Sequence, residues 1–330
     1  MPSIINTSRF AIVGLGQLGG SLALRLRELT CIDVFGCARR EESLKAARER
    51  GMIDAGSTQA EAVLPVVDMT FLCLPLDATV AFVKANLAHF RFGSIVTDVG
   101  SVKGPVVREL RELLYAKGVY FVGSHPMAGS EKCGLEAARA DLFKDAVVFL
   151  TPTPEDDEEA LALVADIWRD LGAIPIELSA ERHDAAVAAA RHAPHLLAAA
   201  IARAVLGRGD REAQSLAGAG AFRDMTRIAA SQPAMWAEIC RHNRGPVLAA
   251  LDAFSAELAA ARALLESGDD AGLTAFFTEA RTLRDRWFTE FGPGRKPPTG
   301  LSPVLEQPPA ESVSAALSAP AAATPNGSPA

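Results

Sequence analysis

The first half of the chain alternates short apolar runs with stretches of helical spacing. The apolar runs that predict strands are 10–13, 32–35, 69–74, 94–97, 119–122, 146–150 and 173–176. Helical patterns at 21–29, 43–50 and 158–171 lie between them, and Gly51 is placed to cap the second of these helices. Strands that alternate with helices predict a largely parallel sheet with helices on both faces.

The pattern changes near residue 179, where strand patterns stop. Alanine- and leucine-rich segments predict helices over 181–206, 211–230, 233–266 and 269–291, with Gly207, Gly209 and Gly268 among the breaks. We therefore expect the α/β class: a Rossmann-like, mostly parallel sheet domain over 1–178, followed by an all-helical domain over 179–292. The surplus apolar surface of the helical domain predicts a homodimer formed through it.

The last segment, 293–330, contains nine prolines and runs of alanine. Such a segment buries too little apolar surface to offset the entropy of ordering it, so we expect it to be disordered.

Composition and charge narrow the class of protein. Of 330 residues, 49% are hydrophobic and 22% are charged, which is ordinary for a globular protein. The net charge of −7 and the scattered basic residues argue against a nucleic-acid partner. The five cysteines form no C-x-x-C pair, which suggests a reducing compartment. We find no targeting pattern and no uninterrupted apolar run of about 18 residues, so we expect a cytoplasmic protein without a membrane partner.

A glycine-rich turn follows the first predicted strand and opens a helix. Gly14 suits the tight turn, Gly16 lets the backbone approach a pyrophosphate, and Gly19 lets the helix pack close to the strand. The helix N-terminus then offers free N–H groups to the phosphates. In this strand–turn–helix context the motif predicts dinucleotide binding, and Gln17 and Leu18 inside the turn belong to the expected cofactor site.

The identity of the dinucleotide is less constrained. The second strand runs into Arg39 and Arg40, without the acid that commonly binds the ribose hydroxyls of NAD. Two arginines suit the 2′-phosphate of NADP, so we favour NADP over NAD. The alternative is that both arginines belong to a solvated helix start. Pro75, at the end of the third predicted strand, completes the expected cofactor site.

Two polar segments follow the fourth and fifth predicted strands. The first, 98–104, contains Ser101 and Lys103, and the second, 123–132, contains His125. Ligands in open parallel sheets lie beyond the carboxyl ends of the strands, so both segments should face the nicotinamide. A histidine beside a hydroxyl suits alcohol oxidation, in which a base takes the hydroxyl proton while the carbon gives up a hydride.

Three motifs in order resemble those of the prephenate/arogenate dehydrogenases, and the resemblance extends over about residues 9–291. They are His125 followed by Pro126, Gly129, Glu131 and Lys132; Glu181, His183 and Asp184 followed by His192, Pro194 and His195; and 220–229 followed by Met235 and Trp236. Two residues depart from the family pattern. Arg191 replaces a small hydroxyl residue, and Cys133 replaces a serine.

The resemblance implies an NAD(P)-dependent oxidative decarboxylation in tyrosine biosynthesis, acting on the small molecules prephenate or arogenate. His125 would accept the proton of the ring hydroxyl, and Ser101 would position that hydroxyl. Arg227 would hold a substrate carboxylate and His195 would line the pocket. The substrate would be enclosed by Gly220 and Trp236, the latter from the same chain or from a dimer-related one.

Other interpretations remain open at this stage. A β-hydroxyacid dehydrogenase usually carries a catalytic lysine on the first helix of its second domain, and 185–206 contains none. A non-catalytic dinucleotide sensor would not need Ser101 and His125 together. His183 suits a structural helix position, and Lys103 suits either a ligand contact or a helix cap. His192 and His195 are three residues apart, as in some zinc sites, but no carboxylate or cysteine cluster completes one, so we expect no metal.

Overall fold

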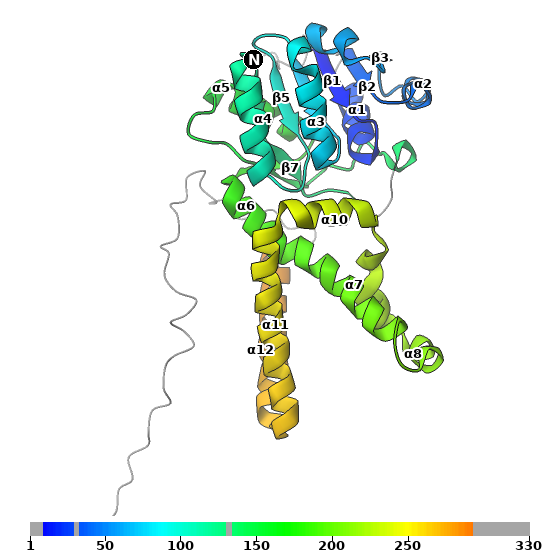
Figure 1. Cartoon of the computed structure of the whole chain (residues 1–330), viewed down its shortest axis with the longest axis vertical. Helices are drawn as coiled ribbons and strands as arrows, with labels where there is room; N and C mark the ends of the chain where they lie inside the picture. Colours follow the sequence, from blue (N-terminus) through cyan, green and yellow to red (C-terminus); the bar gives the residue numbers. More distant parts are fainter. Residues whose placement is uncertain (1–8, 30–32, 130–133, 293–330) are drawn as a thin grey trace, which may run out of the picture.

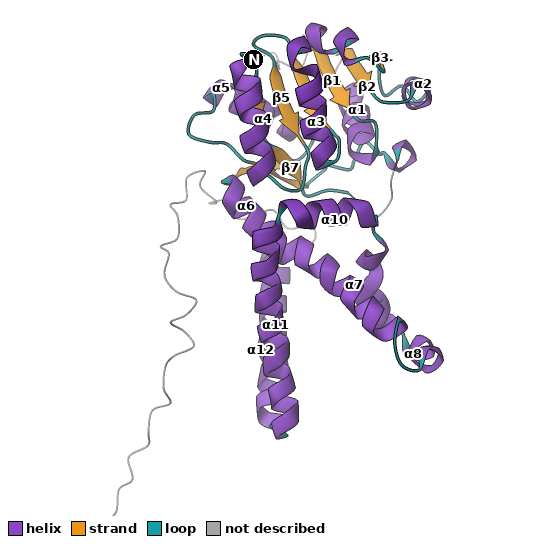
Figure 2. Cartoon of the chain, viewed as in Figure 1, coloured by secondary structure: helices purple, strands orange, loops and turns teal. Residues whose placement is uncertain are grey.

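A six-stranded parallel sheet forms the centre of the N-terminal domain in the computed structural model, which describes residues 9–29, 33–129 and 134–292 (Figures 1 and 2). Its strands are β1 (Arg9–Val13), β2 (Asp33–Cys37), β3 (Ala55–Ser57), β4 (Met69–Leu72), β5 (Ile95–Asp98) and β6 (Tyr120–Val122). The strand order is β3-β2-β1-β4-β5-β6, and each neighbouring pair is parallel. The chain therefore changes direction across the sheet between β1 and β4, the place where such sheets bind ligands.

Helices cover both faces of this sheet because successive strand side chains point to opposite sides. Phe10 and Ile12 of β1 join a core with Trp168, whereas Val13 joins a second core with Leu110. The first core is covered by α1 (Gln17–Leu29), α2 (Glu41–Glu49) and α5 (Glu158–Asp170), and the second by α3 (Leu76–Asn86) and α4 (Gly104–Ala116). Short 3₁₀ turns connect these elements: η2 (Ala60–Ala62), η3 (Leu64–Val66), η4 (Leu87–His89) and η5 (Leu135–Ala137).

A second, three-stranded sheet corrects the predicted topology. It contains β7 (Ser124–Pro126), β8 (Val147–Leu150) and β9 (Ile174–Glu177), with β7 antiparallel and β9 parallel to β8. The prediction that 146–150 and 173–176 extend a single sheet is therefore wrong, as is the placement of His125 in a loop. An apolar run in the sequence predicts a buried strand, but it does not indicate which other strand will pair with that strand. The three-residue strand β3 was not predicted.

The described part of the C-terminal domain is helical (Figure 2). Its elements are α6 (Ala180–Val187), the π-helix η6 (Ala188–His192), α7 (Ala193–Leu206), α8 (Arg211–Ala217), α9 (Gly220–Thr226), η7 (Arg227–Ala230), α10 (Pro233–His242), α11 (Arg244–Ser267) and α12 (Asp270–Phe291). Two predicted helices are divided. The segment 211–230 breaks before Gly220, and the segment 233–266 breaks at Asn243.

The two domains meet along α6 and α10, while α11 and α12 project away as a pair (Figure 1). The Asp77 backbone N–H at the start of α3 donates to Glu238 Oε1 of α10 at 2.6 Å, and His242 Nε2 lies 2.6 Å from Asp77 Oδ1. These three residues are also the only group in the described ranges compact enough to hold a metal ion. The His242 ring and the Asp77 carboxylate already bind each other, and Glu238 binds the Asp77 backbone, so contacts across the domain junction are sufficient to explain the cluster.

The run Ala180–Leu206 has the length and apolar composition of a membrane-crossing helix, a test that the core helix of a soluble protein also passes. Its first half hydrogen-bonds to the sheet domain through His183 and Asp184, both buried. These contacts are typical of a helix inside a folded protein rather than one facing lipid.

Several predicted features lie outside the described residues. They are the beginning of the second predicted strand at Ile32, the loop residues Glu131, Lys132 and Cys133, and the segment 293–330.

Candidate active site

The glycine turn after β1 has the shape that a pyrophosphate requires. Gly14 has φ of 96°, and a Cβ there would lie 2.5 Å from the Cys73 carbonyl oxygen. A Cβ on Gly19 would lie 2.0 Å from the Gly14 oxygen, so α1 can pack this close only with glycine. In contrast, a Cβ on Gly16 would meet nothing within 4 Å. The turn is therefore tight at its two ends and open at Gly16, as the sequence predicts.

The other predicted cofactor residues surround the same edge of the sheet. Gln17 begins α1, and Leu18 packs against the core beneath it, so its backbone rather than its side chain can face a ligand. Pro75 stands just after β4, the neighbour of β1, and precedes the first residue of α3. Arg39 and Arg40 follow β2 and are exposed, with Arg40 as the N-cap residue of α2. All of them lie near the carboxyl ends of β1, β2 and β4.

A chain of two histidines and one aspartate lies at the carboxyl end of the neighbouring strands. His125 on β7 is buried, and its Nδ1 lies 2.8 Å from His183 Nε2 on α6. His183 Nδ1 in turn lies 2.8 Å from Asp184 Oδ1. The aspartate also accepts hydrogen bonds from the backbone N–H groups of Lys103 and Gly104, each at 2.8 Å. We call His125, His183 and Asp184 the histidine relay.

The relay fixes the tautomer of His125. An ionised carboxylate only accepts hydrogen bonds, so His183 must donate its Nδ1–H to Asp184. The Nε2 of neutral His183 then carries a lone pair and accepts the Nδ1–H of His125. His125 is consequently left with an unprotonated Nε2. A histidine held in this way is ready to accept a proton, as in catalytic triads.

Electrostatics keep this histidine neutral. Burial lowers the pKa of His125 well below its usual value, and the neighbouring His183, Arg191 and Lys103 lower it further. Burial also lowers the pKa of His183, an effect that the hydrogen bond to Asp184 opposes. A neutral imidazole is the form that can act as a base.

Lys103 holds the two strands of the site together. It is fully buried and forms an ion pair with Asp98 at the end of β5, and its Nζ also donates to the Ser124 carbonyl oxygen at 2.8 Å. Lys103 also occupies the N-cap position of α4, although its side chain does not cap that helix. Ser101 lies between these anchors in the same loop. Within the described ranges, no hydrogen bond joins its hydroxyl to His125, although both residues follow neighbouring strands at one edge of the sheet.

The predicted substrate residues gather on the helical side. His195 on α7 stacks on Trp236 of α10 in the same chain, with ring centroids 3.5 Å apart and an angle of 20°. Arg227, at the start of η7, is close enough to lower the pKa of His195, although burial has the largest effect. Gly220 begins α9, and a Cβ there would meet only the end of the Arg223 side chain, at 3.9 Å. The structure thus brings His195, Trp236 and Arg227 together beside the relay.

His192 has a structural role. Its Nδ1 lies 3.1 Å from Asn243 Nδ2, which also donates to the Asp184 carbonyl oxygen at 2.8 Å. Burial lowers the pKa of His192 to about 4. Asn243 therefore joins α11 to the relay helix, which explains why the predicted helix 233–266 breaks there.

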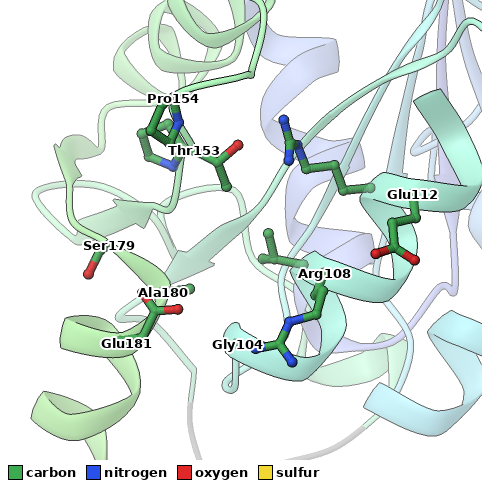
Figure 3. A pocket seen from close by; sticks show the side chains of 11 residues that line it. Gly104, Arg108, Glu112, Thr153, Pro154, Ser179, Ala180 and Glu181 are labelled. Carbon is green, nitrogen blue, oxygen red and sulfur yellow. The ribbon is translucent and has the colours of Figure 1, made fainter.

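A pocket of about 300 Å³ lies between α4 and the start of α6 (Figure 3), and no residue of the relay lines it. It is lined by Gly104 and Arg108 of α4, by Thr153, and by Ser179 and Glu181 at the start of α6, among others. None of the predicted catalytic, substrate or cofactor residues lines it. A second pocket, of about 590 Å³, is lined by the predicted cofactor residue Pro75 and by Met235 of α10, among others.

Sequence reasoning overlooked three contributors to the site. His183 suited a structural position, Asp184 received no role of its own, and Lys103 was left between two minor roles. Their adjacency in the motif Glu181–Asp184 gave a signal, because a carboxylate next to a histidine often orients it. What the sequence did not reveal was that this helix approaches β7.

The fold and the glycine turn define a two-domain, dinucleotide-binding oxidoreductase. The family model described as prephenate dehydrogenase, nucleotide-binding domain, matches residues 22–177, and the model described as its dimerization domain matches residues 179–279. The chain therefore belongs to the prephenate dehydrogenase family.

Individual relatives agree with this assignment. The prephenate dehydrogenase of Bacillus subtilis is 32% identical over 283 residues, which span 83% of this chain and 74% of the relative. The cyclohexadienyl dehydrogenase of Zymomonas mobilis is 33% identical over 279 residues, which span 83% and 94%. The crystal structure of prephenate dehydrogenase from A. aeolicus, in complex with hydroxyphenyl propionate and NAD+, is similar with a TM-score of 0.80 and 32% identity, covering 84% of this chain and 98% of that one.

Proposed function

We propose that this protein oxidatively decarboxylates prephenate or arogenate with a nicotinamide dinucleotide, in tyrosine biosynthesis. The observation that supports this most directly is the histidine relay, which leaves His125 Nε2 free to accept a proton at the carboxyl edge of a dinucleotide-binding sheet. Family membership makes a cyclohexadienol the expected substrate class.

The proposed reaction balances without another reactant. The C–H bond at the hydroxyl-bearing ring carbon breaks, and the bound nicotinamide accepts its hydride. His125 Nε2 takes the hydroxyl proton as positive charge develops on that carbon. The bond to the ring carboxylate then breaks, carbon dioxide leaves, and its electron pair makes the ring aromatic. The phenolate oxygen takes the proton back from His125.

The remaining residues bind and orient the substrate in this proposal. Ser101 positions the ring hydroxyl, and Arg227 holds a carboxylate. His195 and Trp236 form one wall through their stacked rings, and Gly220, at the start of α9, helps to enclose the substrate. The open backbone at Gly16 and the N-terminus of α1 fit a pyrophosphate, so these residues would hold the dinucleotide.

Three finer proposals accompany the activity. The exposed Arg39 and Arg40 beyond β2 favour NADP over NAD. The description of the second family domain and the exposed apolar side chains on α11 and α12 support a homodimer. We also propose a cytoplasmic location, for which the composition and the lack of C-x-x-C pairs are the support.

The test is to mix the protein with NADP or NAD and with prephenate or arogenate, and to follow absorbance of the reduced cofactor. We expect reduction with at least one of the four combinations, accompanied by release of carbon dioxide. Absence of reduction with every combination, from protein that still binds the dinucleotide, would refute the proposed function.

A further inference from the structure

Arg191 is a partly buried arginine beside the histidine relay, and no carboxylate among the described residues neutralises it. It lies in the π-helix η6, and its Nη1 donates to Met127 Sδ at 3.4 Å, a weak acceptor two residues from His125. Within the described ranges no aspartate or glutamate lies within ion-pair distance of its guanidinium. Burying a charged group without a partner of opposite charge costs free energy. We therefore expect such a residue to bind an anionic ligand.

The nearby carboxylates are already engaged. Asp184 accepts hydrogen bonds from His183 and from two backbone N–H groups, and Asp98 is paired with Lys103. The guanidinium is close enough to lower the pKa of His125, His192 and His195. The Trp236 Nε1–H, on the ring stacked against His195, is buried and finds no hydrogen-bond partner among the residues that the structure describes. The described residues around the Arg191 guanidinium therefore offer donors and positive charge but no free carboxylate.

We propose that Arg191 binds the side-chain carboxylate of the substrate and makes the site selective for the keto acid, prephenate, over the amino acid, arogenate. This rests on the proposed function. The side-chain carboxylate is the better partner because it persists through the reaction.

Selectivity follows from the charge next to that carboxylate. Arogenate carries an ammonium group on the adjacent carbon, where prephenate carries a neutral carbonyl. Arg191 attracts the carboxylate of both substrates but repels the ammonium of arogenate. Replacing Arg191 therefore removes a favourable interaction with prephenate. For arogenate it removes both the attraction to the carboxylate and the repulsion of the ammonium group, so the affinity for arogenate should fall less.

A binding experiment tests the anion site without chemistry. Titration calorimetry would measure 3-(4-hydroxyphenyl)propionate binding to the protein loaded with NAD+ or NADP, using Arg191→Gln, Arg191→Lys and the control Arg203→Gln. Arg203 is exposed on the same helical run, in α7. We expect Arg191→Gln to weaken binding by roughly 10- to 100-fold, as for the loss of a charge-assisted hydrogen bond. Arg191→Lys should recover part of this loss, and Arg203→Gln should bind as the wild type does. Unchanged affinity in Arg191→Gln would overturn the proposal.

A kinetic comparison tests selectivity. The wild type should show a higher kcat/KM for prephenate than for arogenate, and Arg191→Gln should lower that ratio mainly through the KM for prephenate, with the KM for the dinucleotide unchanged. Preference of the wild type for arogenate, or a ratio unchanged in Arg191→Gln, would overturn the selectivity. A wild type inactive on both substrates would instead refute the proposed function, while the calorimetric result would still decide whether Arg191 binds a carboxylate.

Discussion

A histidine can act as a base only if one ring nitrogen is free and the ring is held in place, and the relay meets both needs for His125. Asp184 orients His183, and His183 orients His125, so the side chain that meets the substrate is two hydrogen bonds from the carboxylate. We predict that His125→Asn keeps dinucleotide affinity but lowers kcat by roughly 10²- to 10⁴-fold, as for a lost general base. Steady-state rates and a cofactor titration measure this. Near-normal turnover would remove His125 from the chemistry.

The pH dependence should report the same residue. Burial and the neighbouring His183, Arg191 and Lys103 lower the pKa of His125, so it stays unprotonated to a more acidic pH than a free histidine does. Activity is present while His125 is neutral and is lost as pH falls through its lowered pKa. We therefore expect kcat/KM to hold from neutral pH to below 6.5, the usual histidine value, before it declines. Circular dichroism over the same range separates this decline from unfolding, and an acid limb centred above pH 6.5 would contradict the prediction.

We also expect individual side chains to determine whether the protein prefers NADP or NAD. Arg39 and Arg40 are exposed beyond β2, near where the adenosine ribose of a bound dinucleotide would lie. If they bind a 2′-phosphate, replacing both with alanine should raise the KM for NADP by roughly 10-fold or more, as two charge-assisted contacts are lost. The KM for NAD, which has no such phosphate, should change little. Equal changes for both cofactors would assign the two arginines to a solvated helix start.

At the scale of elements, two glycines of the turn between β1 and α1 should have different roles. Gly19 should matter for the stability of the fold, and Gly16 for dinucleotide binding. A Cβ at Gly16 enters open space, so Gly16→Ala should change the free energy of unfolding by less than about 0.5 kcal/mol. It should nevertheless raise the KM for the dinucleotide, because the Cβ occupies the space that the pyrophosphate needs. A Cβ at Gly19 lies 2.0 Å from the Gly14 oxygen, so Gly19→Ala should destabilise the protein by about 1–3 kcal/mol. Urea denaturation measures the stability of both variants, and steady-state kinetics measure their KM for the dinucleotide. A Gly16→Ala variant less stable than Gly19→Ala would contradict the prediction.

The sequence predicts elements better than it predicts their neighbours. Strand β1 and helix α1 follow from the apolar run and the glycine turn, because both signals are local. The pairing of β7 with β8 does not, since it depends on contacts between distant segments. The helix break at Asn243 is also non-local, because that side chain binds His192 and the Asp184 carbonyl on another helix. Likewise, β3 has only three residues, too few to show a period.

At the scale of the whole molecule, the site exists only when both domains are folded together. His125 comes from β7 and His183 from α6, 58 residues later, while Lys103 precedes both. His125 was predicted as the base from its motif and position, but its partners could not be, because spacing along the chain does not report which helix meets which strand. The sequence motifs identified the candidate residues, but only the tertiary structure shows which of them are hydrogen-bonded to one another.

The oligomeric state is also a property of the whole molecule. Helices α11 and α12 project from the body of the protein with large apolar side chains exposed, among them Leu258, Leu265, Phe277 and Trp287 (Figure 1). Exposed apolar patches of this kind are usually covered in a subunit interface. We predict that light scattering gives twice the 34.7 kDa mass of the chain.

Charged substitutions should reveal which surface is covered. Leu258→Asp combined with Phe277→Asp, both more than 60% exposed, should shift the protein toward monomer without loss of helix content. A charge buried in an apolar interface is costly, whereas the same charge on a solvated helix costs little. Phe92→Asp is the matched control, since Phe92 is 80% exposed on the sheet domain, away from α11 and α12. A monomeric wild type, or a double variant that remains a dimer, would show that these two helices do not form the interface.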